Sequence, residues 1–313
     1  MIKQNTHQIL MIEPVAFGYN AETAKNNYFQ HNDSSATTEI QATALAEFKA
    51  MCSLLKQKGV QPLVLRDSLN PHTPDSIFPN NWISFHHDAS IALYPMFAPN
   101  RRAERRSHII DELAQHGFKC LKIVDLTESE HVGKYLEGTG SMVLDRTHQK
   151  SYACLSQRTD TDVLNHFCDA FHFEPITFQA FQTVEGKRLP IYHTNVMMSI
   201  GENFAVICTA SIDQEHERQT VLNTLVADGK EIIDISEAQM HHFAGNLLQI
   251  ENATGNKLIA LSQTAYESLT QEQIKQLQKH GELLPIAIPT IEKYGGGSVR
   301  CMMAELFLPQ HNS

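Results

Sequence analysis

The chain has 313 residues, of which 42% are hydrophobic and 19% are charged, an ordinary composition for a globular protein with a large core. Its formal net charge of −10 argues against a nucleic-acid-binding protein, because such proteins carry basic surfaces. The N-terminal residues are polar, and no apolar run is long enough to span a bilayer. We therefore expect a soluble, cytoplasmic protein without a signal peptide or a membrane association.

The six cysteines are widely scattered, and in a reducing compartment this predicts free thiols rather than a disulfide framework. They are Cys52, Cys120, Cys154, Cys168, Cys208 and Cys301. The first five lie in apolar helix or strand patterns that are typical of a core. Cys301 differs because it follows a run of three glycines, and glycine allows the backbone to approach a ligand closely. Taken alone, Cys301 could still be a buried core thiol.

Hydrophobic periodicity predicts a strand at 9–12, a helix at 37–58 and a strand at 60–65. A unit of hairpin, helix and strand then recurs along the chain. The expected hairpins are 81–94, 141–155, 195–209 and 246–261. The expected helices are 101–116, 160–170, 214–227 and 271–280, followed by strands at 120–124, 171–178, 231–234 and 283–288. A last apolar segment, 301–308, starts a fifth unit, and the strand at 9–12 is a candidate partner for it.

The hairpins begin about 50 to 60 residues apart, a period that is typical of repeat arrays and propellers. We therefore predict an α/β fold in one domain, residues 1–313, with five ββαβ units closed around an axis. Closure would remove the sheet edges that such short strands otherwise expose. The longest irregular stretches, 66–80 and 289–298, could be functional loops.

Polar residues stand at the hairpin starts, where a core strand would be apolar. If the hairpins face the axis, these residues line one mouth of it. Collected there, Cys301, His193 and Glu137 offer a nucleophile, an acid or base, and a carboxylate. Asn81 and Asn195 add two amides. Each has a structural alternative: the chain has 17 histidines, and either asparagine could cap a strand.

Several motifs resemble those of the guanidino-group-modifying superfamily, which includes arginine deiminases, dimethylarginine hydrolases and amidinotransferases. Leu136-Glu137-Gly138 resembles the start of the deiminase Leu-Glu-Gly-Gly-Asp motif, and His193 with Asn195 resembles the His-x-Asp motif. The segment 295–302 resembles the glycine-rich loop before the nucleophilic cysteine. The segments 94–104 and 156–159 resemble those that each supply one arginine. Together these motifs span most of the chain, and the resemblance implies the five-bladed α/β propeller (pentein) fold.

The resemblance also implies roles for the residues. Cys301 would attack the substrate carbon, and Glu137 would hold the terminal nitrogens of the substrate. His193 would begin protonated beside the thiolate, protonate the leaving amine and then activate water. Arg101 and Arg158 would bind the α-carboxylate of an amino-acid substrate.

The chain departs from the deiminase pattern at Asn81 and Asn195, where deiminases have aspartate. Two carboxylates suit a guanidinium cation, whereas neutral amides supply both donors and acceptors and suit a neutral ureido group. Together with the segments 78–82 and 94–102, this favours the bacterial citrulline-utilisation hydrolase branch. The expected reaction converts citrulline to ornithine, CO2 and NH3 through a covalent cysteine intermediate.

Two alternatives remain open at this point. One is an arginine deiminase or amidinotransferase with the same residues, and the other is a non-catalytic propeller that binds a partner. No cofactor or metal is expected, because adjacent histidines on a strand point to opposite faces and no cluster has zinc spacing. The expected ligand is a small amino acid, and a homo-oligomer is compatible with the sequence.

Overall fold

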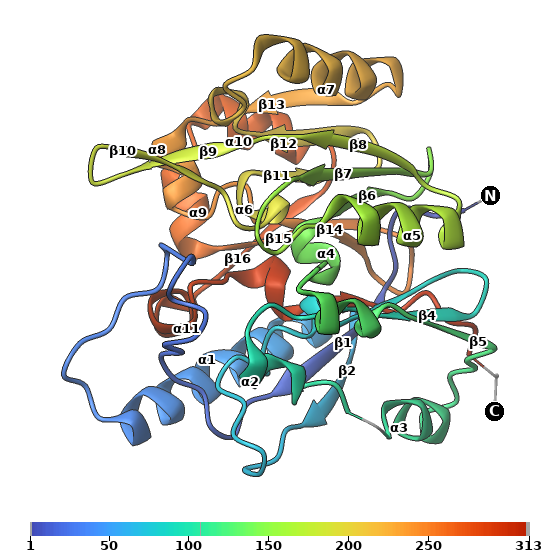
Figure 1. The fold of residues 1–313 in the computed structure, drawn as a ribbon, viewed down its shortest axis with the longest axis vertical. Coiled ribbons are helices and arrows are strands. Elements are labelled where there is room, and N and C mark those ends of the chain that lie inside the picture. Colours follow the sequence, from blue (N-terminus) through green and yellow to red (C-terminus); the bar gives the residue numbers. More distant parts are fainter. Residues whose placement is uncertain (1, 107, 311–313) are drawn as a thin grey trace.

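The computed structural model describes residues 2–106 and 108–310 and has an α/β fold. Within these residues the strands form five three-stranded sheets and one two-stranded sheet. In Figure 1 the short helices α4 and α6 lie near the centre, whereas the longer helices α1, α5 and α7 lie at the periphery. None of the helices in the described residues combines the length and the apolar character that crossing a membrane requires.

Four of the three-stranded sheets follow the predicted hairpin, helix and strand pattern. In each, two antiparallel strands form a hairpin, and a third strand runs parallel to the second. The strands are β3 (Ile83–Phe85), β4 (Ser90–Leu93) and β5 (Lys122–Asp125); β6 (Val143–Asp145), β7 (Lys150–Cys154) and β8 (Glu174–Phe178); β11 (Met198–Ile200), β12 (Phe204–Ile207) and β13 (Glu231–Asp234); and β14 (Leu248–Glu251), β15 (Lys257–Ser262) and β16 (Glu282–Ile286).

The fifth sheet joins the two ends of the chain. It contains β17 (Ala304–Glu305), β1 (Gln8–Glu13) and β2 (Gln61–Arg66), in that order. β17 pairs antiparallel with β1, and β1 pairs parallel with β2, so this sheet has the same arrangement as the other four. The expected pairing of the C-terminal apolar segment with the N-terminal strand is confirmed.

Four helices connect the second and third strands of their sheets as predicted. They are α1 (Thr37–Gln57), α5 (Thr161–Phe171), α7 (Glu215–Ala227) and α10 (Gln271–Gln278). Their starts follow from the sequence: Asp160 accepts the backbone N–H groups of Asp162 and Val163, and Thr270 forms a capping box with Gln273. Three shorter helices are α8 (Glu237–His241), α9 (Gln263–Ser268) and α11 (Pro289–Gly295).

The single helix expected at 101–116 is wrong. The chain forms two short helices instead, α2 (Pro99–Arg102) and α3 (Ile109–Gln115), and residue 107 between them lies outside the described residues. Two arginines of this stretch bind a group elsewhere in the fold, because Arg102 and Arg105 both pair with Glu130. These tertiary contacts outweigh the helical propensity of the segment.

One hairpin was not expected from the sequence. Strands β9 (Phe181–Val184) and β10 (Lys187–Pro190) form a two-stranded sheet between β8 and the third hairpin. Its turn, Glu185-Gly186, has positive φ at both residues, as tight hairpin turns require.

Short helical turns precede the hairpins, so the predicted strand starts at 81, 141, 195 and 301 are too early. The turns are η1 (Pro79–Asn81), α4 (Gly138–Ser141), α6 (Thr194–Met197) and η4 (Val299–Met302). Two further turns are η2 (Thr127–Val132) and η3 (Thr209–Ser211). α4 contacts both η1 and α6, and η1 contacts η4. These contacts bring together residues that are far apart in the sequence.

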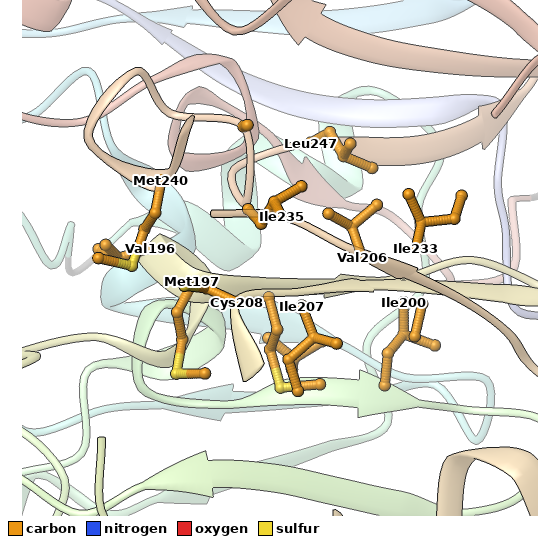
Figure 2. Packing of buried hydrophobic residues seen from close by; sticks show 14 of the residues in the cluster. Val196, Met197, Ile200, Val206, Ile207, Cys208, Ile233, Ile235, Met240 and Leu247 are labelled. Atoms are coloured by element: carbon orange, nitrogen blue, oxygen red, sulfur yellow. The ribbon is translucent and has the colours of Figure 1, made fainter. Parts of the chain in front are cut away.

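Buried apolar residues hold these turns in place. In the cluster shown in Figure 2, Val196 and Met197 of α6 pack with Val206, Ile207 and other residues of the third sheet. Leu247, just before β14, belongs to the same cluster. The residues next to Val196 and Leu247 are Asn195 and Asn246, so the core fixes where these two side chains start.

Candidate active site

Cys301 lies in η4 at a small pocket that is also lined by Asn81, Arg101, Arg158 and His193. Its side chain is buried, as are most of the other cysteines, and all six are free. Cys120 is the exception among the five expected core thiols, because it is half-buried. The structure therefore brings the predicted nucleophile and the predicted base to one cavity.

The glycine run before Cys301 is explained by close packing. A Cβ on Gly295 would lie 2.8 Å from Phe78 Cζ, and one on Gly297 would lie 2.9 Å from the same atom. Gly296 has φ +60°, which favours glycine, and a Cβ there would also meet Asn27 at 2.7 Å. The loop can pass over Phe78 and place Cys301 only because these three residues lack side chains.

Glu137 and His193 form a buried pair. His193 Nε2 lies 2.7 Å from Glu137 Oε2, and Glu137 is fully buried at the N-terminal end of α4. The carboxylate also accepts from the backbone N–H of Phe97 at 2.9 Å and from Arg158 Nη1 at 3.3 Å. Glu137 is thus placed to orient the imidazole. A direct role in holding substrate nitrogens stays a prediction.

Burial and the nearby charges set the protonation preference of the His193 imidazole. Burial favours a higher pKa for Glu137, but the Arg158 charge and the hydrogen bond to His193 together hold this pKa well below its usual range. Burial lowers the pKa of His193 to about 4, outweighing the attraction of Glu137. Because an ionised carboxylate can only accept, Nε2 carries the proton and Nδ1 keeps its lone pair. Burial therefore favours a neutral His193 over the initially protonated one that we expected from the sequence.

Gly140 makes room for two polar atoms. A Cβ built on Gly140 would lie 2.3 Å from Asn81 Nδ2 and 2.8 Å from His193 Nδ1. Such distances are far below contact separation, so a side chain at residue 140 would displace both groups. Asn81 Nδ2 and His193 Nδ1 thus both lie against Gly140.

The two predicted asparagines present opposite hydrogen-bonding atoms. Asn81 Oδ1 accepts from Arg101 Nη1 at 2.8 Å, and because arginine only donates, the amide nitrogen of Asn81 must point away. Asn195 Nδ2 lies 3.4 Å from Cys301 Sγ. Among the described residues, nothing pairs with Asn81 Nδ2 or with Asn195 Oδ1, although both atoms are buried. These two asparagines therefore leave one donor and one acceptor unused; Asn81 lines the pocket, and Asn195 lies against Cys301.

Arg101 and Arg158 both line the pocket, but their guanidinium groups are largely occupied. Arg101 binds Glu104 through Nε and Nη2, each at 2.9 Å. Arg158 donates to the backbone oxygen of Thr23 at 2.9 Å and lies over the ring of Tyr192, 4.8 Å from its centroid. The predicted role of both arginines in binding a substrate carboxylate stays a prediction, and it would have to use the remaining Nη1 N–H groups.

Two site residues were missed by the sequence interpretation. Asn246 Nδ2 lies 3.3 Å from Cys301 Sγ. It lies just before the fourth hairpin, as Asn81 and Asn195 lie before the first and third, so this equivalence could have identified it. Asp75 lines the pocket from the loop 66–80 and has a buried oxygen that nothing in the described part of the chain pairs with. Burial raises the pKa of Asp75, against the opposing effect of Arg101.

A possible metal-ligand group lies outside the pocket that contains Cys301. Asp145, His148 and Asp228 have ligand atoms within 4.8 Å of one another. Lysines already neutralise both carboxylates, because Lys230 lies 2.8 Å from Asp145 and Lys150 lies 2.7 Å from Asp228. This arrangement forms an ion-pair network rather than a suitable cation site.

Comparison of the chain with known proteins identifies its family. Residues 13–308 match the family described as "N,N dimethylarginine dimethylhydrolase, eukaryotic". The chain belongs to this family. It is accordingly a hydrolase of the type that acts on guanidino C–N bonds. Comparison with the curated proteins returns no match.

Solved structures share the fold of this family member. The N-terminal domain of ArgZ, an arginine dihydrolase of Cyanobacteria, bound to substrate, has 14% identity and a TM-score of 0.71 over 96% of this chain and 97% of its own. AgrE in complex with ornithine and NAD+ has 15% identity and a TM-score of 0.71 over 98% of this chain and 40% of its own. A dimethylarginine dimethylaminohydrolase variant has 15% identity and a TM-score of 0.63 over 98% of this chain and 100% of its own.

Proposed function

We propose that this family member hydrolyses the terminal ureido group of citrulline to give ornithine, CO2 and NH3. The supporting observation is the pair of unused polar atoms, the donor Asn81 Nδ2 and the acceptor Asn195 Oδ1. A ureido group carries a C=O that needs a donor and N–H groups that need acceptors, so it can satisfy both atoms. Arg101 fixes the Asn81 amide in the orientation that offers the donor.

A guanidinium group fits these atoms less well. It has only donors, so Asn81 Nδ2 would remain buried without a partner, at a cost of about 1–3 kcal/mol. The pocket wall also contains the cationic side chains of Arg101 and Arg158. Like charges in a buried site repel, although Glu104 and Glu137 offset part of this effect.

The proposed mechanism uses Cys301 and His193 in two stages. The Cys301 thiol gives its proton to His193 Nδ1, and the sulfur attacks the ureido carbon to form a C–S bond. The bond from that carbon to the side-chain nitrogen breaks, and this nitrogen takes the proton from His193 and leaves as the amine of ornithine. Water then attacks the S-carbamoyl group while His193 carries a proton back to the sulfur. The released carbamic acid decomposes to CO2 and NH3.

Arginine is the second candidate substrate, and Asp75 is the observation that favours it. Its unpaired buried oxygen lines the pocket and could accept from a guanidinium. The matched structures of ArgZ and AgrE also include complexes described with substrate and with L-arginine. An amidinotransferase would use the same residues but would need an amine acceptor in place of water.

We also infer how the five sheets are arranged around the site. The five sheets of equal arrangement form a five-bladed propeller in a single domain. In support, β17 contacts β3, β6 contacts β11, and β11 contacts β14. We further propose a cytoplasmic enzyme that needs no cofactor and takes a small amino acid.

A substrate panel tests the function. Purified protein is incubated separately with citrulline, arginine and NG,NG-dimethylarginine, and ornithine, citrulline and ammonia are measured. We expect ornithine and ammonia from citrulline, with at least tenfold lower kcat/KM for arginine and for NG,NG-dimethylarginine.

Asn81→Asp replaces the amide donor with a carboxylate oxygen. It should therefore lower kcat/KM for citrulline about tenfold or more and shift the preference toward arginine.

Asn223→Asp provides the matched control, because it makes the same chemical change at an exposed position of α7. It should leave all three rates unchanged. Formation of citrulline from arginine with no ornithine from citrulline would refute the ureido proposal and support the deiminase alternative. A Cys301→Ala variant that retained full activity would refute the covalent mechanism.

A further inference from the structure

We propose that Asn246, together with Asn195, holds the Cys301 thiolate through two amide N–H groups and is a catalytic residue of this enzyme. This inference deepens the proposed function and rests on it for the nucleophilic role of Cys301. It does not depend on which substrate is attacked. Asn246 contacts the sulfur of Cys301 and the backbone of Asn195 and Arg300.

Both amide nitrogens approach the sulfur at similar distances. Nδ2 of Asn246 lies 3.3 Å from Cys301 Sγ, and Nδ2 of Asn195 lies 3.4 Å from it. These are hydrogen-bonding distances for a sulfur acceptor, and hydrogen bonds to a charged acceptor are stronger than those to a neutral one. Asn246 is only 2% exposed, so water competes little for its N–H groups. The pair is therefore suited to stabilise negative charge on Sγ.

The orientation of the Asn246 amide is fixed by its other contacts. Its Oδ1 accepts the backbone N–H of Arg300 at 3.1 Å, and its Nδ2 also donates to the backbone oxygen of Asn195 at 2.9 Å. Because the backbone N–H of Arg300 can only donate, a flipped amide would lose this bond. Both ends of Asn246 are thus engaged within the protein, whereas Asn195 Oδ1 has no partner among the described residues. Asn246 Oδ1 also lies 3.7 Å from Cys301 Sγ, farther than Nδ2 at 3.3 Å, so the amide donor is the nearer of the two atoms to the sulfur.

Gly245 lets the chain next to Asn246 approach α6 closely. A Cβ on Gly245 would lie 2.4 Å from the backbone oxygen of Val196 and 2.8 Å from the carbonyl carbon of Met197. Glycine therefore lets the turn before β14 lie directly against α6. Leu247 and Val196 anchor the two segments in the apolar cluster of Figure 2. This packing holds the two amides next to one sulfur atom.

The surrounding charges explain why amides would be needed. His193 is neutral because burial lowers its pKa to about 4, so it does not supply a permanent cation beside the thiolate. Arg101 and Arg158, which share the pocket, are paired with Glu104 and Glu137. The charged groups that line or back this site are Asp75, Arg101, Glu104, Glu137 and Arg158. Neutral amide N–H groups stabilise the sulfur anion through their dipoles. They add no positive charge with which a nearby carboxylate could pair.

The test measures thiolate formation without substrate. Iodoacetamide alkylation of Cys301 is followed against pH by peptide mass spectrometry, which separates it from the half-buried Cys120. In Asn246→Asp a carboxylate replaces the donor, so the pH midpoint should rise by about one to two units and the rate at pH 7 should fall about ten- to hundredfold. Asn246→Ala should shift the midpoint in the same direction by a smaller amount.

Asn223→Asp is again the control and should match the wild type. An unchanged midpoint in folded Asn246→Asp, with a native circular dichroism spectrum, would overturn the proposal even if turnover fell. If both variants at residue 246 fail to fold, Asn195→Ala replaces them, and its midpoint should also rise because one donor is lost. An unshifted midpoint in Asn195→Ala would equally overturn the proposal. A shifted midpoint in a protein that leaves citrulline intact would support the thiolate contacts and reject the citrulline proposal.

Discussion

His193 shows how burial at a single residue sets the direction of a proton transfer. Its Nε2 is bound to Glu137, and its Nδ1 lies beside Gly140, as does the amide nitrogen of Asn81. With a pKa lowered to about 4, the imidazole is a base over most of the pH range, and Glu137 decides which nitrogen carries the lone pair. A carboxylate that holds a histidine in one tautomer is a familiar way to prepare a general base.

The pH dependence of the enzyme follows from this residue. As the pH falls through about 4, His193 takes up a proton, loses its lone pair and no longer accepts the thiol proton. We therefore expect kcat/KM to keep its plateau at pH 6 and to fall on an acid limb with a midpoint near 4. Glu137→Gln removes the attraction that favours the protonated imidazole, so the limb should move to lower pH while kcat drops about tenfold or more.

The measurement is a pH profile of kcat/KM between pH 3.5 and 8, restricted to the range in which circular dichroism shows folded protein. His193→Ala should remove turnover at every pH. An acid limb centred near 6.5, the ordinary value for histidine, would show that His193 is not held neutral by burial.

At the scale of elements, the short helical turns before the hairpins carry the site. η1 and η4 supply Asn81 and Cys301, and α6 supplies Asn195. The turns meet because small residues allow it, and Gly140 in α4 is the clearest example. These turns of three or four residues each lead into a strand and carry a polar side chain of the site. The close approach of these turns is therefore a requirement of the catalytic geometry.

Gly140→Ala tests this requirement. The added methyl group would lie 2.3 Å from Asn81 Nδ2, so Asn81 or the adjacent His193 must shift. Misplacement of reacting groups by about 1 Å costs on the order of a hundredfold in rate, so we expect kcat to fall ten- to hundredfold. Steady-state kinetics measure the change. Gly18→Ala is the control, since its Cβ would meet only Thr37 Cγ2 at an ordinary 3.7 Å. Equal activities in the two variants would contradict the packing argument.

At the scale of the whole molecule, pairing of the two chain ends holds the nucleophile in place. β17 begins two residues after η4 and pairs with β1 through Ile9 with Glu305 and Leu10 with Ala304. Leu10 is fully buried in a cluster with Trp82 and Ile83. A strand from the N-terminus thus anchors the segment that carries Cys301, while the same cluster supports the chain after Asn81. Stability and catalytic geometry share these contacts.

Leu10→Ala should lower the free energy of unfolding by about 2–5 kcal/mol, because it removes buried methyl groups and leaves a cavity. Chemical denaturation measures this difference. Leu121→Ala is the matched control: Leu121 is 65% exposed, so the change should stay within about 0.5 kcal/mol. A similar loss in both variants would show that the β1 contacts have no special role.

The sequence by itself determined the alternation of strands and helices, the repeated hairpin unit and the set of residues at the hairpin starts. Apolar periodicity and turn residues are local, so α1 and α5 could be predicted, whereas the pairing of β1 with β17 followed from the incomplete fifth repeat. The helix at 101–116 could not, because Arg102 and Arg105 bind groups outside their own segment.

Tertiary structure alone decided the state of the site. The neutral form of His193 depends on burial, and the unused donor of Asn81 depends on Arg101, which lies 20 residues further along the chain. Asn246 is similar: its type and position were visible in the sequence, but its contact with Cys301 spans 55 residues. Sequence patterns report which groups are present, whereas protonation and hydrogen-bonding partners depend on which groups the fold brings within a few ångströms.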